Sequence, residues 1–150
     1  MPWVRTIHLI VSNKEQVKDY MRTPKTHVVL HSDIIPAKFL PTFNSTTIEM
    51  FIPNIQGLAE HFIYSNDDMF PVAPLSKEDF FTEDGKIRVN FKEMVFSNSD
   101  HNQFHRVCWN NHRDVLIALG LPLKGMNHFR PRHTMSAMLL SDCKECIELM

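Results

Sequence analysis

The chain has 150 residues, of which 43% are hydrophobic, and a formal net charge of −1. This length fits one domain with its own core, and the near-neutral charge excludes the broad basic surface of nucleic-acid-binding proteins. No apolar run approaches the roughly 20 residues that cross a bilayer, and residues 1–5 lack the features of a signal peptide.

The first part of the chain predicts a strand–helix–strand unit. Residues 3–11 and 26–30 are apolar and rich in β-branched side chains, which indicates buried strands. Between them, Ser12 and Asn13 can cap a short helix over residues 14–21. A helix that joins two strands within about thirty residues is typical of a parallel unit.

A short helix is predicted ahead of the next strand. Thr46 and Glu49 have the spacing of a capping box, and Pro53 limits how far the helix can run. Asn44 and Ser45 stand at its start, where ordinary helix caps are found. Backbone N–H groups at a helix start also attract anions, so both residues fit a ligand role as well.

A third strand is predicted over residues 61–65, where an apolar, aromatic run leads into polar residues. The two earlier strands end in polar residues too. We therefore expect one parallel sheet through residues 4–11, 26–30 and 61–65, with Asp33 and Asp67 at the same edge.

The second part of the chain predicts an edge hairpin and helices. The Asp-Gly pair at 84–85 predicts a tight turn in a hairpin-like piece over residues 81–91. Helical spacing covers residues 102–119 and 134–149, and residues 121–132 read as irregular. The predicted fold class is α/β: a Rossmann-like three-layer piece with a parallel sheet, followed by a hairpin-like edge and C-terminal helices.

Asn66, Asp67 and Asp68 follow the third predicted strand directly. Adjacent carboxylates are costly for a core, but they can hold a divalent cation that in turn binds phosphate. On an extended backbone the two carboxylates point in opposite directions. We therefore expect only one of them to bind the cation directly, unless the backbone turns and presents both carboxylates on the same side.

The cysteines and most histidines carry weaker signals. An odd count of three cysteines without a disulfide framework indicates a reducing compartment. Cys143 and Cys146 have CxxC spacing, and we interpret them as residues of a terminal helix, with zinc or redox chemistry as the alternative. Three histidines share one predicted helical face, and a metal site there would need a fixed partner: His101, His105 and His112.

Several short motifs occur in a fixed order: LPTFNS at 40–45, Ile48–Glu49, Gly57–Leu58, HFIY at 61–64 and NDD at 66–68. This order resembles the central block of the Stealth family of sugar-1-phosphate transferases. That family includes bacterial capsular polysaccharide phosphotransferases and the animal N-acetylglucosamine-1-phosphotransferase. The resemblance extends to further segments: residues 2–7, Asn111 with Leu116 and Gly120, RPRH at 130–133 and MLLS at 138–141.

The resemblance implies that residues 1–150 form a single, partial phosphotransferase domain. The central block covers about residues 2–92, and a histidine block covers about residues 102–150. The family's first strand block and its last, arginine-bearing block are missing, so we expect a fragment or a truncated member with little activity of its own. Without that first strand, the apolar edge of residues 3–11 invites homo-oligomers or aggregates.

The resemblance implies transfer of a sugar-1-phosphate from a nucleotide-sugar donor to a hydroxyl of a saccharide acceptor. The phosphodiester formed would belong to capsular or exopolysaccharide synthesis. The expected location is cytoplasmic, with membrane association through a capsule-assembly complex. Two alternatives stay open: a nucleotide-sugar glycosyltransferase, which releases a nucleoside diphosphate, and a non-catalytic ligand-binding or scaffold member.

The resemblance also implies roles for individual residues. Catalytic roles fall to Asp67, Asp68 and His133, and the two carboxylates are the expected ligands of a divalent cation, Mg²⁺ or Mn²⁺. His133 would act as an acid or base near the transferred phosphate, with His128 as its competitor for the place of the family histidine. The expected substrate-binding residues are Asn44, Ser45, Glu49, Asn66, His31, Asn111 and His128.

Overall fold

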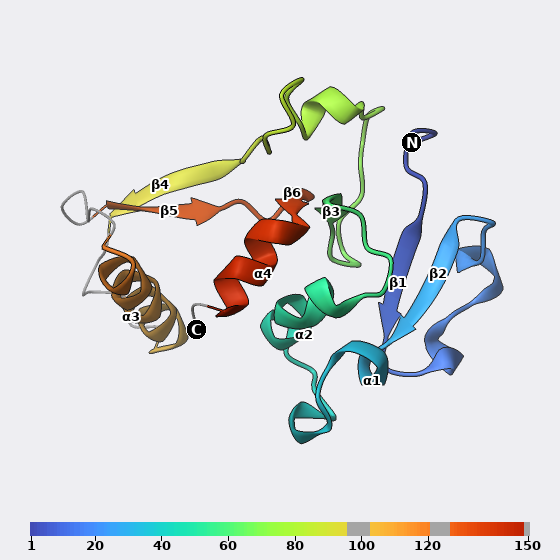
Figure 1. Cartoon of the computed structure of the whole chain (residues 1–150), viewed down its shortest axis with the longest axis horizontal. Coiled ribbons are helices and arrows are strands. Elements are labelled where there is room, and N and C mark those ends of the chain that lie inside the picture. Colours follow the sequence, from blue (N-terminus) through green and yellow to red (C-terminus); the bar gives the residue numbers. More distant parts are fainter. Residues whose placement is uncertain (96–102, 121–126, 149–150) are drawn as a thin grey trace. The chain divides into compact units, whose positions relative to one another are not determined.

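The computed structural model describes residues 1–95, 103–120 and 127–148. The chain divides into two compact units. The first joins Met1–Arg88 to Met135–Met150, and the second is Val89–Thr134. Each unit is described separately below (Figure 1).

The first unit opens with a parallel strand pair. Strand β1 (Ile7–Val11) pairs with β2 (Thr26–Leu30) in a register that sets Ile7 opposite Thr26. This confirms the predicted parallel unit. The crossover contains two 3-10 turns, Lys14–Gln16 and Asp19–Met21, in place of the predicted helix.

The crossover helix fails to form because its first turn is closed by side chains. The Asn13 side chain accepts from Glu15 N, and the Gln16 side chain accepts from Ser12 N and Asn13 N. Val17 then takes extended backbone angles, and its side chain is buried. Burial of this β-branched residue thus ends the turn after three residues.

The third predicted strand is β3 (His61–Tyr64), but it does not join the parallel pair. It pairs antiparallel with β6 (Ser136–Leu139), with His61 opposite Leu139. The prediction of one three-stranded parallel sheet, with Asp33 and Asp67 at a common edge, is therefore wrong. The α/β class itself, with a small parallel sheet, an antiparallel hairpin and a C-terminal helix, is confirmed.

The first unit also holds its helices between and after these strands. Helix α1 (His31–Ile34) follows β2, and α2 (Ser45–Phe51) continues into a 3-10 turn at Ile52–Asn54. Helix α4 (Leu140–Glu148) follows β6. Two further 3-10 turns lie at Ala37–Phe39 and Lys77–Asp79.

At the start of helix α2, one predicted cap is confirmed and the other is not. The Oδ1 atom of Asn44 accepts from Thr46 N at 2.9 Å and from Thr47 N at 3.3 Å, so Asn44 is the N-cap. The predicted capping box of Thr46 and Glu49 is wrong, because Asn44 precedes Thr46 and satisfies the same end of the helix. Pro53 lies in the 3-10 turn that ends the helical segment, as predicted.

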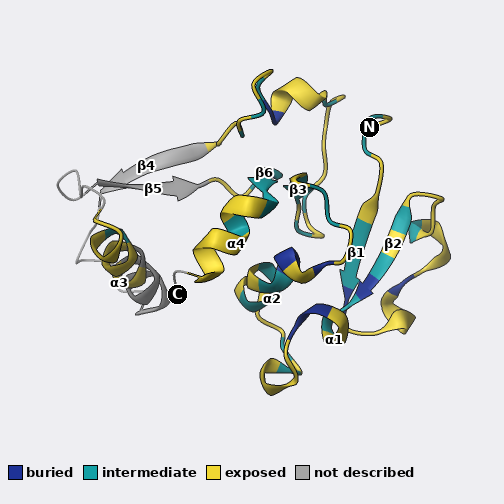
Figure 2. Cartoon of the chain, in the orientation of Figure 1, coloured by how far each residue is buried: buried dark blue, intermediate teal, exposed yellow. Residues whose placement is uncertain are grey.

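Strand β3 separates two apolar clusters. Its side chains alternate, so Phe62 and Tyr64 pack on one cluster and Ile63 packs on the other. The first cluster is built on Val29, Ile34, Ile35, Ile52 and Ile55. The second is built on Phe80, Phe81 and Ala137. Figure 2 shows these buried residues in dark blue around α1, the end of α2 and the segment before β4.

The hairpin-like piece before β4 is only partly regular. Phe81 and Ile87 form an isolated antiparallel bridge, and Gly85 turns the chain with φ +81°. This confirms the predicted tight turn, because only a residue without a Cβ adopts that angle readily. The regular strand β4 begins only at Phe91, the last residue of the predicted hairpin-like piece.

The second unit contains a hairpin and a helix. Strand β4 (Phe91–Val95) pairs antiparallel with β5 (Asn127–Pro131). Helix α3 (Gln103–Ala118) confirms the predicted helix over residues 102–119. Of the stretch predicted as irregular, residues 121–126 lie outside the described residues, and residues 127–131 form β5.

Candidate functional site

The polar residues after β3 form a turn. Met69 N donates to Asn66 O at 3.4 Å, which makes Asp67 and Asp68 the two central residues of the turn. Both aspartates are exposed, whereas Asn66 is half-buried. The expectation that the two carboxylates alternate along an extended backbone does not apply, because the backbone turns here. A shared ligand for the two carboxylates stays a prediction.

A hydrogen-bond network fixes the base of this turn. The Tyr64 hydroxyl, on the last residue of β3, donates to Glu49 Oε1 at 2.8 Å. The same hydroxyl meets the side-chain amide of Asn66. Because a phenol has one hydrogen, the hydroxyl donates to one of its two oxygen partners at a time, Glu49 Oε1 or Asn66 Oδ1. Helix α2, strand β3 and the turn are thereby joined at one oxygen atom.

Tyr64 is a site residue that the sequence analysis missed. From the sequence, Tyr64 was interpreted only as a residue of an apolar, buried strand. An available signal was a tyrosine two positions before an Asn-Asp-Asp run, with a glutamate in the preceding helix. Such a phenol usually finds a polar partner when it is buried.

Burial and three neighbouring carboxylates shift the pKa of Tyr64. Burial raises the pKa of Tyr64 above its ordinary value, and the hydrogen bond and charge of Glu49 raise this pKa further. The charges of Asp67 and Asp68 act in the same direction. The phenol therefore stays protonated at neutral pH and remains a donor. Three carboxylates close enough to act on one hydroxyl make this surface negative and favour a bound cation.

A small cavity lies behind the network. Its volume is about 30 Å³, and its lining residues come from α2, β3, β6 and α4: Glu49, Ile52, Pro53, Phe62, Tyr64, Met138 and Cys143. A cavity needs about 10–15 Å³ to hold one water, so this one has room for about two. It is too small for a sugar or a nucleotide.

The CxxC cysteines lie in α4, where the sequence predicts a helix. Cys143 is half-buried, Cys146 is exposed, and both are free thiols. Burial raises the pKa of the Cys143 thiol, and the neighbouring Cys146 and Asp142 raise it further. A raised pKa lowers the thiolate fraction that redox or metal chemistry requires.

Asn44 and Ser45, the candidates at the start of α2, have structural positions in the helix. Asn44 uses its side-chain oxygen as the cap described above, and Ser45 is exposed as the first residue of the helix. A cap bonded to two N–H groups leaves fewer of them for an anion. Direct ligand roles for Asn44 and Ser45 stay predictions.

The remaining candidates lie on other elements. His31 begins α1 and is half-buried, and burial lowers the pKa of this imidazole. Asn111 is exposed on α3, and His128 lies in β5. His133 is exposed in the segment that follows β5. The structure thus brings Glu49, Asn66, Asp67 and Asp68 together around Tyr64, whereas the last three candidates belong to the second unit.

The donor set of the turn suits a hard divalent cation. Mg²⁺ is usually held by one or two carboxylates together with substrate phosphates and waters. Asp67 and Asp68 supply two exposed carboxylates next to an amide. Across residues 1–95, 103–120 and 127–148, no group of three or more His, Cys, Asp or Glu side chains could hold a metal ion. Phosphate and water would therefore complete the ligand set.

None of the helices in the described parts of the chain combines the length and apolar character needed to cross a membrane.

A family model described as Stealth protein CR2, conserved region 2, matches residues 1–89 of the chain. The chain belongs to the Stealth family. The matched region contains β1, β2, α2, β3 and the Asn66–Met69 turn, so the network around Tyr64 lies within Stealth conserved region 2.

Curated relatives are also similar to this Stealth chain. An exopolysaccharide phosphotransferase of Lactiplantibacillus plantarum is 45% identical over 86 residues, which cover 56% of this chain and 25% of that protein. A capsular polysaccharide phosphotransferase of Actinobacillus pleuropneumoniae is 46% identical over 98 residues, which cover 65% of this chain and 26% of that protein. An exopolysaccharide phosphotransferase of Streptomyces coelicolor is 45% identical over 121 residues, which cover 77% of this chain and 20% of that protein. The chain spans about a quarter, or less, of the length of these relatives.

Proposed function

We propose that this chain contributes the cation- and diphosphate-binding part of a Stealth sugar-1-phosphate transferase in capsular or exopolysaccharide synthesis. The observation that carries the proposal is the turn of Asp67 and Asp68, held at its base by the Glu49–Tyr64–Asn66 network. The phosphotransferase names of the relatives support the same class of reaction.

In the proposed reaction, a hydroxyl oxygen of a saccharide acceptor attacks the phosphorus that carries the donor sugar. The new bond joins this oxygen to phosphorus, and the bond from phosphorus to the bridging oxygen of the diphosphate breaks. A nucleoside monophosphate leaves with that bridging oxygen. The hydroxyl proton passes to a base, for which we propose His133.

The residues around the turn would prepare the donor for this attack. Asp67 and Asp68 would hold Mg²⁺ or Mn²⁺, which supplies positive charge to the diphosphate. Tyr64 keeps Glu49 and Asn66 in place through its hydroxyl, so the turn has a fixed geometry before substrate arrives. A fixed polar arrangement lowers the reorganisation that the transition state would otherwise require.

The identity of the released nucleotide tests this proposal. A longer chain that adds the family's first and last blocks to these 150 residues is incubated with a panel of UDP- and GDP-sugars, an oligosaccharide acceptor and Mn²⁺, and the nucleotides are separated by chromatography. We expect a nucleoside monophosphate, released together with a phosphodiester product, and a loss of at least tenfold in Asp67→Asn.

Two results would contradict the proposal. A nucleoside diphosphate as product would indicate a glycosyltransferase, because the broken bond would then be at the anomeric carbon. Tight binding of nucleotide-sugar without turnover in that longer chain would indicate a non-catalytic binding member.

A further inference from the structure

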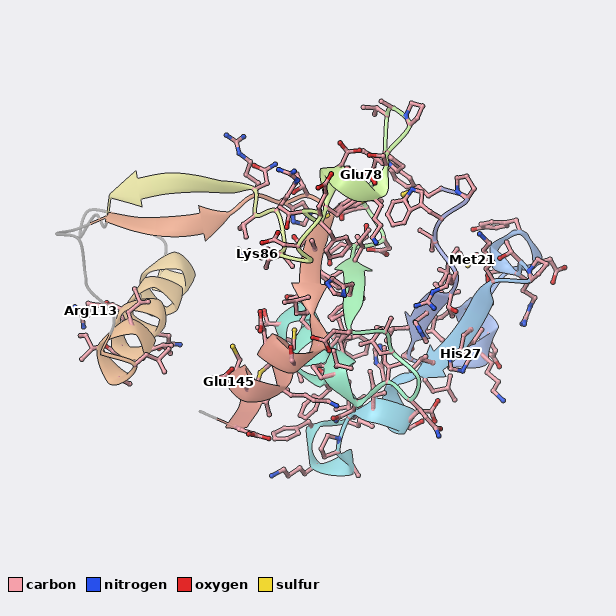
Figure 3. The ribbon with its side chains drawn as sticks, turned by 45° about the horizontal axis from the view of Figure 1, so that its top comes forward. Met21, His27, Glu78, Lys86, Arg113 and Glu145 are labelled. Atoms are coloured by element: carbon pink, nitrogen blue, oxygen red, sulfur yellow. The ribbon has the colours of Figure 1, made fainter. Side chains whose placement is uncertain are left out.

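Two histidines face each other across the parallel pair, on strands that the proposed transferase chemistry does not use. His8 of β1 and His27 of β2 stand opposite one another in the strand register. Their Nδ1 atoms are 3.1 Å apart, and the rings meet edge to face with centroids 5.2 Å apart. Figure 3 labels His27 on its strand. His8 is half-buried and His27 is exposed, so solvent reaches the pair.

The short distance requires at least one free nitrogen lone pair. If both Nδ1 atoms carried hydrogen, the two N–H groups would oppose each other. Burial and the charge of His27 lower the pKa of His8, which favours the neutral form of the His8 ring at neutral pH. A neutral imidazole is the form that binds metal ions. Loss of the remaining Nδ1 hydrogen to the other ring nitrogen would leave a lone pair on each Nδ1 atom.

The spacing of the two nitrogens matches a shared metal ion. Metal–nitrogen bonds of about 2.0–2.1 Å place two ligand nitrogens about 3.0 Å apart at a right angle and about 3.4 Å apart at a tetrahedral angle. The observed 3.1 Å lies between these values. We propose that His8 and His27 form a two-histidine site for a divalent first-row transition-metal ion, bound through both Nδ1 atoms.

This site differs in chemistry from the turn after β3. Imidazole prefers ions such as Zn²⁺, Ni²⁺ and Cu²⁺, whereas the carboxylates of Asp67 and Asp68 suit Mg²⁺ or Mn²⁺. No third protein ligand of a suitable type joins the histidines within the described ranges, so water completes the coordination. An ion held by both rings would clamp β1 to β2 and stabilise the folded chain.

Nickel is the appropriate probe, because the free thiols of the chain compete for zinc more strongly than for Ni²⁺. Paramagnetic Ni²⁺ is titrated into the full chain, and the ring signals of all histidines are followed by NMR. We expect the His8 and His27 signals to broaden together, before those of other histidines, and the melting temperature to rise with Ni²⁺.

Substitutions separate a shared ion from two independent contacts. In the shared site, His8→Gln and His27→Gln should each weaken Ni²⁺ binding at least tenfold, and the loss in the double variant should be smaller than the two single losses combined. His61→Gln is the matched control, because His61 bonds its Nε2 to Gly85 O and lies on another strand. It should leave Ni²⁺ binding unchanged.

The proposal is overturned if each single substitution weakens binding twofold or less, or if other histidines broaden first, which would indicate adventitious binding only. If the variants fail to fold, as judged by circular dichroism, the wild-type titration decides alone. Broadening of only one of the two rings would then refute a shared ion.

Discussion

At the scale of single residues, the Tyr64 hydroxyl is the atom that organises the candidate site. It joins Glu49 of α2 to Asn66 of the turn. The sequence placed Glu49 and Asn66 among the candidates but could not show that one phenol connects them. Contacts between residues fifteen positions apart depend on tertiary packing, which a local pattern does not contain.

We predict that Tyr64→Phe weakens both the fold and the cation site. Loss of the hydroxyl leaves the half-buried Glu49 without its donor, which costs about 1–3 kcal/mol of unfolding free energy. Denaturant unfolding measures this loss, and titration with Mn²⁺ in the presence of a nucleotide-sugar measures the effect on the site. Ile63→Val, which shortens a side chain on the other face of β3, is the control and should change stability alone. Unchanged Mn²⁺ binding in Tyr64→Phe would show that the network does not position the turn.

Substitutions at Asn44 can separate its role as a helix cap from a role in binding substrate. Asn44→Ala should destabilise the chain by about 1 kcal/mol because the cap is lost. Asn44→Ser keeps a capping oxygen and should restore most of that stability. If Asn44 also binds substrate, Asn44→Ser will weaken nucleotide-sugar binding while the unfolding free energy stays near that of the wild type. Equal binding by both folded variants and the wild type would assign Asn44 to the cap alone.

At the scale of elements, the beginning of α4 is tied to the beginning of β3. Leu140 N donates to Glu60 O at 2.8 Å, and the Ser141 hydroxyl donates to Glu60 Oε1 at 2.5 Å. The hydrogen bond from the Ser141 hydroxyl lowers the pKa of Glu60 below its ordinary value of 4.5. The bonded form is thus the ionised carboxylate.

This bond predicts an acid-sensitive contribution to stability. Because the folded pKa of Glu60 lies below the unfolded one, the contribution is complete above about pH 4.5 and is lost as the pH falls through the folded pKa. Thermal unfolding of wild type and Glu60→Gln across this range checks the prediction. The difference between the two proteins should shrink toward acid. A constant difference would show that ionisation of Glu60 is irrelevant to the fold.

The same elements show what a sequence pattern can and cannot predict. Strands β1 and β2 and helix α3 were predictable, since their apolar spacing has one clear period. Residues 136–139 were assigned to a helix because Met135, Met138 and Leu139 fit helical spacing. They form β6 instead, because β3 needs a partner for its backbone hydrogen bonds. Pairing between distant segments overrode the local preference.

At the scale of the whole molecule, β1 presents an unpaired edge. Within the described residues, β1 pairs with β2 in a sheet of two strands. An unpaired strand edge is a template for pairing with another chain, and a two-stranded sheet is only marginally stable alone. We therefore predict concentration-dependent self-association, seen by size-exclusion chromatography with light scattering.

Charge on that edge should suppress the association. Ile7 begins β1 and is 46% exposed, so Ile7→Lys adds a charge to the edge strand without filling the core. Val72→Lys adds the same charge at a fully exposed residue of the loop after the turn and serves as the control. A wild-type chain that stays monomeric, or equal effects of both variants, would contradict association through β1.

The central claim is that the turn after β3 binds a divalent cation together with a diphosphate. Paramagnetic Mn²⁺, added in the presence of a UDP-sugar, should broaden the backbone NMR signals of residues 64–69 first. Asp67→Asn and Asp68→Asn should each weaken this effect at least tenfold, and Asp67→Asn, at an exposed residue, should change the free energy of unfolding by no more than about 0.5 kcal/mol. Broadening that centres elsewhere on the chain, or that survives both substitutions, would contradict the claim.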